Sequence, residues 1–211
     1  MLKILLLCSV FFILNVNAND EPYIPSVLPS KNEVLRIKEN DIVIGCENAK
    51  NTIIEYSSLG CPHCAEYYKT VFPRIKSEII NTCKAKYVYR DFPMTKSALK
   101  ASGMLHCVIK DDDNKEKNDH FMRLVQTLFN SQASWAFTPQ YEENISKILS
   151  IIGIPQNRIS QCVFDKAILN DIISNSFIST KVLNIAHSPS IFINGIEVQP
   201  LTFDSVSAAI K

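Results

Sequence analysis

The sequence has almost no net charge, because 22 lysine and arginine residues are balanced by 21 aspartate and glutamate residues in a chain of 211. Proteins that bind nucleic acid usually have a clear basic excess, so we expect no nucleic-acid partner. The sequence has no internal repeat and no low-complexity segment. After its N-terminal stretch it also lacks any apolar run of the roughly 20 residues that span a bilayer. A hydrophobic content of 46% excludes a disordered chain. What remains is a globular protein of one large domain or two small ones.

The N-terminal residues have the three-part pattern of a secretory signal peptide. Lys3 precedes an apolar run over residues 4–14, and Val16-Asn17-Ala18 places small residues where a signal peptidase cuts. We expect residues 1–18 to be removed by cleavage between Ala18 and Asn19. The mature protein is then expected in the periplasm, where disulfides can form and persist.

The middle of the first half predicts a βαβ unit. Residues 52–57 and 87–90 are short apolar runs of the kind that form buried central strands. The segment between them, from Pro62 to about Ile80, has helical spacing, with a kink expected at Pro73. This order predicts a right-handed connection between two parallel strands.

The rest of the chain predicts a sheet interrupted by helices. Residues 19–33 contain three prolines and indicate an extended leader. Further strands are expected at 34–44, 190–193 and 196–198, the last two joined by Asn194-Gly195 in a type I′ turn. Helical patterns cover 96–110, 119–131, 141–152, 156–161, 164–181 and 203–210. We therefore expect an α/β protein with a sheet domain at 34–94 and 183–211 and a helical insertion at 95–182.

The chemistry is concentrated at Cys61-Pro62-His63-Cys64, where a predicted strand turns into a helix. At a helix N-terminus, unpaired N–H groups and the macrodipole favour an anion, so Cys61 should ionise readily and act as the nucleophile. His63 should stabilise that anion through its ring, and Cys64 should be the resolving thiol. A zinc site is the weaker interpretation, because no second Cys-x-x-Cys or spaced His pair accompanies the motif. A purely structural disulfide is another alternative.

These motifs resemble DsbA-type thiol:disulfide oxidoreductases over nearly the whole mature chain. The resemblance rests on Cys61-Pro62-His63-Cys64, on Arg90-Asp91-Phe92-Pro93 after the next strand, and on Ser188-Pro189 before the hairpin. It implies a thioredoxin fold with an inserted helical domain and an exported enzyme that donates its disulfide to reduced, unfolded secreted proteins. It further implies re-oxidation by a DsbB-type membrane oxidase. We expect a monomer that needs no metal and no cofactor.

Three further residues take on roles only through this resemblance. Pro189 matches the family's cis-proline beside the active cysteines, and Ser188 before it should pair with substrate through its backbone. Glu55 matches a partly buried acid that relays a proton from Cys64, although a surface carboxylate is the alternative. His187 is expected to be a loop residue without a catalytic role, and Trp135 a core residue.

Four other cysteines remain in the mature chain, and they allow three complete pairings. We favour a structural disulfide between Cys107 and Cys162, which lie on predicted helices of the insertion and resemble a second disulfide in DsbA-like proteins of α-proteobacteria. Cys46 and Cys83 each precede a strand of the parallel pair, so they form either another disulfide or a pair of buried thiols.

Two other functions stay open at this point. One is a disulfide isomerase or reductase that uses the same dithiol. The other is a non-catalytic holdase in which Cys61 and Cys64 form a structural bridge. The reduction potential distinguishes these from an oxidase.

Overall fold

The computed structural model describes residues 21–110, 112, 116–163 and 165–210. The predicted signal peptide and its cleavage between Ala18 and Asn19 lie outside the described residues. No helix in the described ranges is both long and apolar enough to cross a membrane.

The centre of the molecule is a mixed sheet of five strands in the order β1-β3-β2-β4-β5. The parallel pair is β2 (Asn51–Ser57) and β3 (Ala85–Asp91), as the βαβ pattern predicts. The antiparallel strands are β1 (Ile42–Ile44) on β3, β4 (Ser190–Ile193) on β2, and β5 (Ile196–Glu197) on β4. The turn between β4 and β5 has positive φ at both Asn194 (50°) and Gly195 (86°). These angles are those of the predicted type I′ turn.

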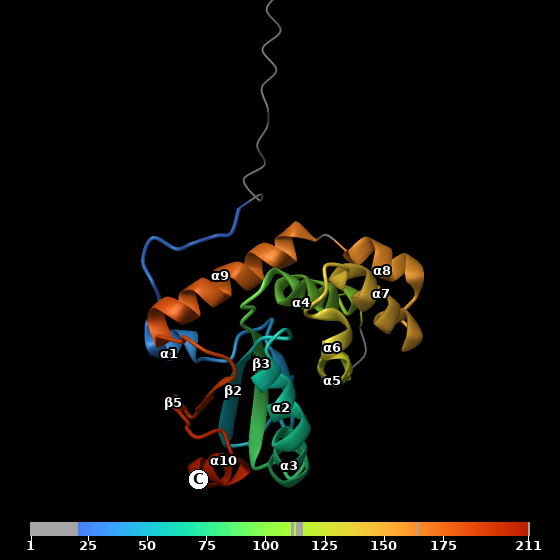
Figure 1. Cartoon of the computed structure of the whole chain (residues 1–211). Coiled ribbons are helices and arrows are strands. Elements are labelled where there is room, and N and C mark those ends of the chain that lie inside the picture. Colours follow the sequence, from blue (N-terminus) through green and yellow to red (C-terminus); the bar gives the residue numbers. More distant parts are fainter. Residues whose placement is uncertain (1–20, 111, 113–115, 164, 211) are drawn as a thin grey trace, which may run out of the picture.

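Helices cover both faces of this sheet (Figure 1). On one face, Ile53, Tyr87 and Tyr89 pack into a core shared with the helices between β2 and β3 and with the insertion. On the other face, Ile54, Tyr56 and Val88 pack into a smaller cluster. This cluster is covered by helix α1 (Lys31–Val34) and by the C-terminal end of helix α9 (Lys166–Leu183). The alternation of side chains along β2 and β3 produces these two cores, since neighbouring residues point to opposite faces.

The predicted strand over residues 34–44 is wrong except at its end. A short helix, α1 (Lys31–Val34), occupies its start, and β1 contains only Ile42–Ile44. The Ser30 hydroxyl accepts a hydrogen bond from the Glu33 N–H, and the Glu33 carboxylate accepts one from the Ser30 N–H (2.7 Å). This capping box is a helix-start signal that outweighs the β-branched residues that follow.

The predicted helix from Pro62 to Ile80 begins at Pro62 but is divided in two places. It consists of α2 (Pro62–Thr70), α3 (Phe72–Ile75) and a π-helical turn, η1 (Lys76–Ile80). The first division falls at Val71, between α2 and α3. Pro73 therefore lies in the first turn of α3, where its missing N–H costs no helical hydrogen bond.

The insertion contains more helices than the sequence pattern predicts. The expected helices are α4 (Lys96–Val108), α5 (Lys117–Asn130), α7 (Tyr141–Ile151), α8 (Gln156–Cys162) and α9 (Lys166–Leu183). A four-residue helix, α6 (Gln132–Trp135), was not expected. After the hairpin, α10 (Phe203–Ala209) packs against α3. In Figure 1, α9 runs from the insertion to α1, so it links the helical part to the far face of the sheet.

Candidate active site

Cys61 is the N-cap residue of α2 and follows the tight turn after β2. Pro62 occupies the first helical turn, and Cys64 lies inward from it with 0% exposure, whereas Cys61 is partly exposed. A Cβ built on Gly60 would lie 3.0 Å from the Thr95 hydroxyl and 3.2 Å from the Ala98 Cβ. Glycine at this position therefore lets the turn approach the first residues of the insertion closely.

The surroundings of Cys61 favour its thiolate. Its pKa falls from an ordinary value near 9 to about 5, mainly because the Cys64 thiol hydrogen-bonds to it. Ser188 and the backbone N–H groups of Cys64 and His63 also lower the pKa, against an opposing effect of burial. His63 contributes through its backbone N–H, as the helix N-terminus position allows, and its side chain is exposed.

Cys64 has the opposite environment. Its pKa is raised well above the ordinary value, first by burial, then by the hydrogen bond to Cys61 and the charge of Glu55. The Ser58 N–H lies 3.5 Å from its sulfur. The two thiols are therefore unequal: Cys61 is anionic at neutral pH, and Cys64 keeps its proton.

Glu55 lies on β2 directly beneath the dithiol and is 0% exposed. The surface-carboxylate alternative is therefore wrong. The hydroxyls of Tyr68 (3.0 Å) and Tyr87 donate hydrogen bonds to Glu55 Oε2. The Glu55 pKa is raised to about 7, mainly by burial and in smaller part by the charge of Asp91, while hydrogen bonds from Tyr87, Ser57 and Tyr68 oppose the shift. A carboxyl group with this pKa can exchange a proton with Cys64 near neutral pH.

The peptide bond between Ser188 and Pro189 is cis and lies beside Cys61. In its protonated form the Cys61 thiol donates to the Ser188 carbonyl oxygen at 3.2 Å. The Ser188 hydroxyl donates to the Met94 sulfur at 3.3 Å, and its side chain also lowers the Cys61 pKa. His187 is an exposed loop residue whose ring lies 3.2 Å from the Ser190 hydroxyl.

Gln132 is a site residue that the sequence analysis missed. Its buried side-chain amide donates to the carbonyl oxygens of Leu59 (2.7 Å) and Cys61 (3.0 Å), so α6 holds the active-site turn from the insertion side. A four-residue helix is too short for hydrophobic periodicity to indicate it. Trp135, at the end of α6, is 0% exposed and donates its ring N–H to the Leu128 carbonyl (2.9 Å), which places it in the core.

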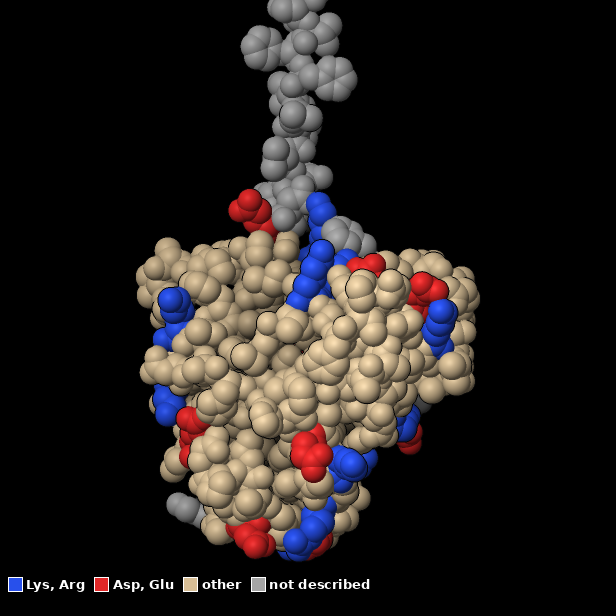
Figure 2. Space-filling view, viewed as in Figure 1, with Lys and Arg blue, Asp and Glu red and all other residues tan. Residues whose placement is uncertain are grey.

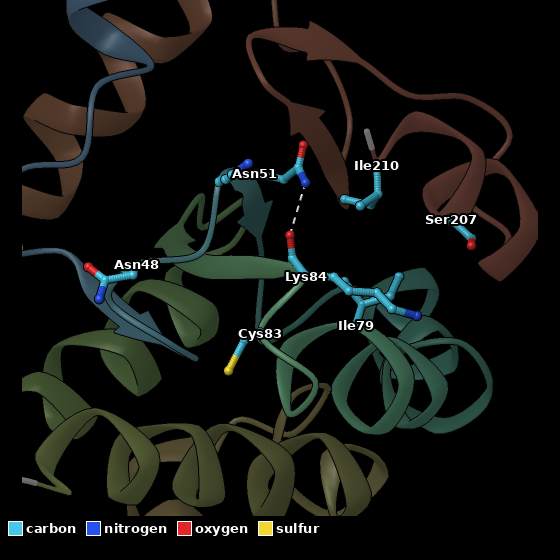
Figure 3. Close-up of a pocket in the computed structure, with 8 residues that line it drawn as sticks. Asn48, Asn51, Ile79, Cys83, Lys84, Ser207 and Ile210 are labelled. Atoms are coloured by element: carbon cyan, nitrogen blue, oxygen red, sulfur yellow. Dashed lines mark hydrogen bonds between the residues drawn. The ribbon is translucent and has the colours of Figure 1, made fainter.

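The other cysteines within the described residues are joined in two disulfides, Cys46–Cys83 and Cys107–Cys162. The first borders a cavity of about 530 Å³ at the ends of the strands remote from Cys61 (Figure 3). There the Asn51 amide donates to the Lys84 carbonyl at 2.9 Å and ties the starts of β2 and β3 together. Among the described residues, no three His, Cys, Asp or Glu side chains gather as a metal-binding group.

Comparison with known proteins places this geometry in a family. A family model described as Thioredoxin matches residues 38–211. The chain belongs to the thioredoxin family. A Rickettsia bellii protein, whose name assigns it provisionally as a protein-disulfide oxidoreductase, is 35% identical over 83% of this chain and 65% of its own length. A similarly named Rickettsia conorii protein is 31% identical over 92% of this chain and 70% of its own. The chain thus spans about two thirds of the length of these relatives.

Solved structures agree with the sequence matches. The crystal structure of Wolbachia pipientis alpha-DsbA1 superposes with a TM-score of 0.76 at 28% identity, over 86% of this chain and 94% of that one. Bacillus subtilis BdbD gives a TM-score of 0.70 at 18% identity, over 90% and 96% of the two chains, and this shows a common fold. The predicted resemblance to DsbA-type proteins is confirmed, as is the thioredoxin fold with an inserted helical domain.

Proposed function

We propose that this protein is an exported thiol:disulfide oxidoreductase that introduces disulfides into secreted or periplasmic proteins through Cys61 and Cys64. The observation that carries the proposal is the opposite protonation preference of two adjacent thiols: the Cys61 pKa is about 5, and that of Cys64 is raised. The family match supports dithiol chemistry, and the names of the Rickettsia relatives refer to the same reaction.

The reaction consists of two exchanges. A substrate thiolate attacks the Cys61 sulfur of the oxidised pair, so the Cys61–Cys64 bond breaks, and Cys64 leaves with the electron pair and takes up a proton. A second substrate thiolate then attacks the substrate sulfur of the mixed disulfide and expels Cys61 as a stabilised thiolate. The substrate leaves oxidised, and the enzyme is left with a Cys61 thiolate and a Cys64 thiol.

The low pKa of Cys61 makes the oxidised form a better disulfide donor. At neutral pH, the shift from near 9 to about 5 stabilises the reduced form by about 3 kcal/mol. For a two-electron couple this corresponds to an increase in the reduction potential of about 60 mV. Because Cys61 is partly exposed, solvent screening reduces this increase in the reduction potential, and we take about half of it as the lower bound.

Partners and location follow from the same proposal. Reduced, unfolded secreted proteins are the proposed substrates, with their backbone pairing beside Ser188 and Pro189. In Figure 2, charged side chains of both signs lie mainly around the margin of the face shown and its centre is uncharged, which fits loose recognition of many chains. A DsbB-type membrane oxidase is the proposed re-oxidant, and the protein acts as a periplasmic monomer.

The reduction potential of purified protein in glutathione buffers tests the proposal. A value near about −120 mV supports the oxidase, near about −270 mV a reductase, and below about −300 mV an inert bridge. Cys61→Ser should abolish oxidation of a reduced peptide, and Cys64→Ala should trap mixed disulfides. Oxidation at wild-type rates by Cys61→Ser would refute the mechanism.

A further inference from the structure

An unusual set of unpaired polar atoms surrounds Glu55. In the described part of the chain, six buried side-chain oxygens have no hydrogen-bond partner. Five of them belong to one region: Glu55 Oε1, Ser57 Oγ, the hydroxyls of Tyr67 and Tyr89, and Asp91 Oδ1. Buried unpaired polar atoms are few in native proteins, and a concentration of them requires an explanation.

Strand register explains why these groups lie together. Glu55 pairs with Tyr89 and Ser57 pairs with Asp91 across the parallel strands β2 and β3. Since residues two apart on a strand share a face, all four side chains lie on the face that carries the dithiol. The Ser57 hydroxyl interacts with Cys64, Glu55 and Tyr89, although it makes no hydrogen bond of ordinary length. A band of polar side chains on this face therefore lies between Cys64 and Asp91.

The band reaches solvent at His106 on α4. Its Nε2 lies 2.6 Å from Asp91 Oδ2, and the side chains of His106 and Asp91 are 26% and 5% exposed. The imidazole is held on its other side by Phe121, with ring centroids 4.6 Å apart. Tyr89, Asp91 and His106 all line a cleft of about 850 Å³. Tyr68, which also bonds to Glu55, is fully buried and offers no such outlet.

We propose that the Asp91–His106 pair links Glu55 to solvent and sets the protonation of Glu55, and through it that of Cys64. The inference rests on the proposed function, because each turnover adds a proton to Cys64 and later removes it. When substrate thiolate breaks the Cys61–Cys64 bond, Cys64 leaves with the electron pair and takes the Glu55 proton. The protonated Asp91–His106 pair then returns a proton to Glu55, and His106 takes one from solvent. His106 is thus a positioning residue, because it acts through Asp91.

Charge explains the expected pH effects. Asp91 is a buried negative group near Glu55 and makes the second carboxylate harder to form. His106 Nε2 bonds to Asp91 Oδ2 and shares a proton with it, so the loss of His106 should favour protonated Glu55, and the loss of the Asp91 charge should favour the carboxylate. The other titratable groups facing Glu55 are Cys64, Tyr67, Tyr68, Tyr87 and Tyr89. Charged groups at the cleft are Lys38, Glu39, Lys110, Lys117 and Asp171, together with the ion pair Asp41–Arg90.

The test follows Cys64 alone. Protein carrying glutathione on Cys61 is prepared, and release of glutathione, as the Cys64 thiolate attacks, is measured against pH. His106→Gln keeps a donor to Asp91 but cannot be charged, and should raise the midpoint of the profile by about one pH unit, which is a tenfold loss of rate below the midpoint. Asp91→Asn should lower the midpoint, and His106→Lys should restore it toward wild type.

His120 provides a matched control. It lies 3.1 Å from Asp112 with its side chain 33% exposed, so it forms a similar pair on α5. His120→Gln should leave the midpoint unchanged. The inference is overturned if His106→Gln behaves like His120→Gln, or if His106→Gln and Asp91→Asn shift the midpoint in the same direction. Failure of the oxidase proposal would be seen separately in the reduction potential, because glutathione release requires no protein substrate.

Discussion

Replacement of Cys64 tests the claim that this thiol is the main cause of the low Cys61 pKa. The hydrogen bond between the two thiols is the largest of the effects that lower the Cys61 pKa to about 5. Cys64→Ala removes the donor and leaves the helix N-terminus intact. Cys64→Ser keeps a donor of similar size in the same place, so it is the matched control.

The size of the change follows from the strength of a hydrogen bond to an anion. Such a bond contributes about 1.5–3 kcal/mol, which corresponds to about one to two pKa units. Since Cys61 is partly exposed, we take the lower end of this range, about one unit. The Cys61 pKa should therefore rise from about 5 to about 6 in Cys64→Ala. In Cys64→Ser it should stay near the wild-type value.

The pKa is measured by ultraviolet absorbance of the thiolate and, independently, by the pH dependence of alkylation with iodoacetamide. Both variants contain a single active-site thiol, so the titration has one step. Equal pKa values in the alanine and serine variants would show that the donor is not responsible. An alanine variant with an unchanged pKa would assign the low value to the helix N-terminus instead.

Four further outcomes are expected. Ser188→Ala should raise the Cys61 pKa and so make the reduction potential of the dithiol more negative, by up to about 30 mV for each unit by which the pKa rises, measured in glutathione buffers. Glu55→Gln should raise the free energy of unfolding by up to about 3 kcal/mol above pH 7 and leave it unchanged below pH 4.5. The reason is that a buried carboxyl group with a raised pKa destabilises the folded protein as the pH rises between these two values, whereas glutamine stays neutral. Equal gains in urea unfolding at both pH values would contradict this. Replacing both Cys107 and Cys162 by alanine should cost about 4 kcal/mol from loop entropy, with an unchanged potential. Gln132→Ala should cost about 1–3 kcal/mol, seen as a lower Tm, because two carbonyl groups lose their donor.

The parts of the fold that the sequence predicts well are those fixed by local patterns. The strands of the parallel pair are short apolar runs, and the type I′ turn at Asn194-Gly195 follows from residues that tolerate positive φ. The start of α2 at Pro62 follows from the preference of proline for a first helical turn. In each case the residues involved lie within a few positions of one another.

Sequence patterns mislead where two local signals compete or where a contact between distant residues decides the structure. The capping box at Ser30 was visible in the sequence, but β-branched residues after it suggested a strand. The burial of Glu55 depends on α2 and β3, which supply Tyr68 and Tyr87. Nothing in residues 52–57 alone distinguishes a buried proton acceptor from a surface carboxylate, so this part of the site required the structure.

The helical insertion is part of the active site, although the sequence pattern separates it from the sheet domain. Gly60 packs against Thr95 and Ala98 at the start of α4, so the turn before Cys61 is shaped by the insertion. Gln132 on α6 bonds to the carbonyl of Cys61 itself. His106, also on α4, reaches Asp91 at the end of β3. The insertion therefore contacts the site at three points: the turn at Gly60, the backbone of the nucleophile Cys61, and the carboxylate of Asp91. A change in its packing should alter the reactivity of the dithiol even when no residue of the sheet changes.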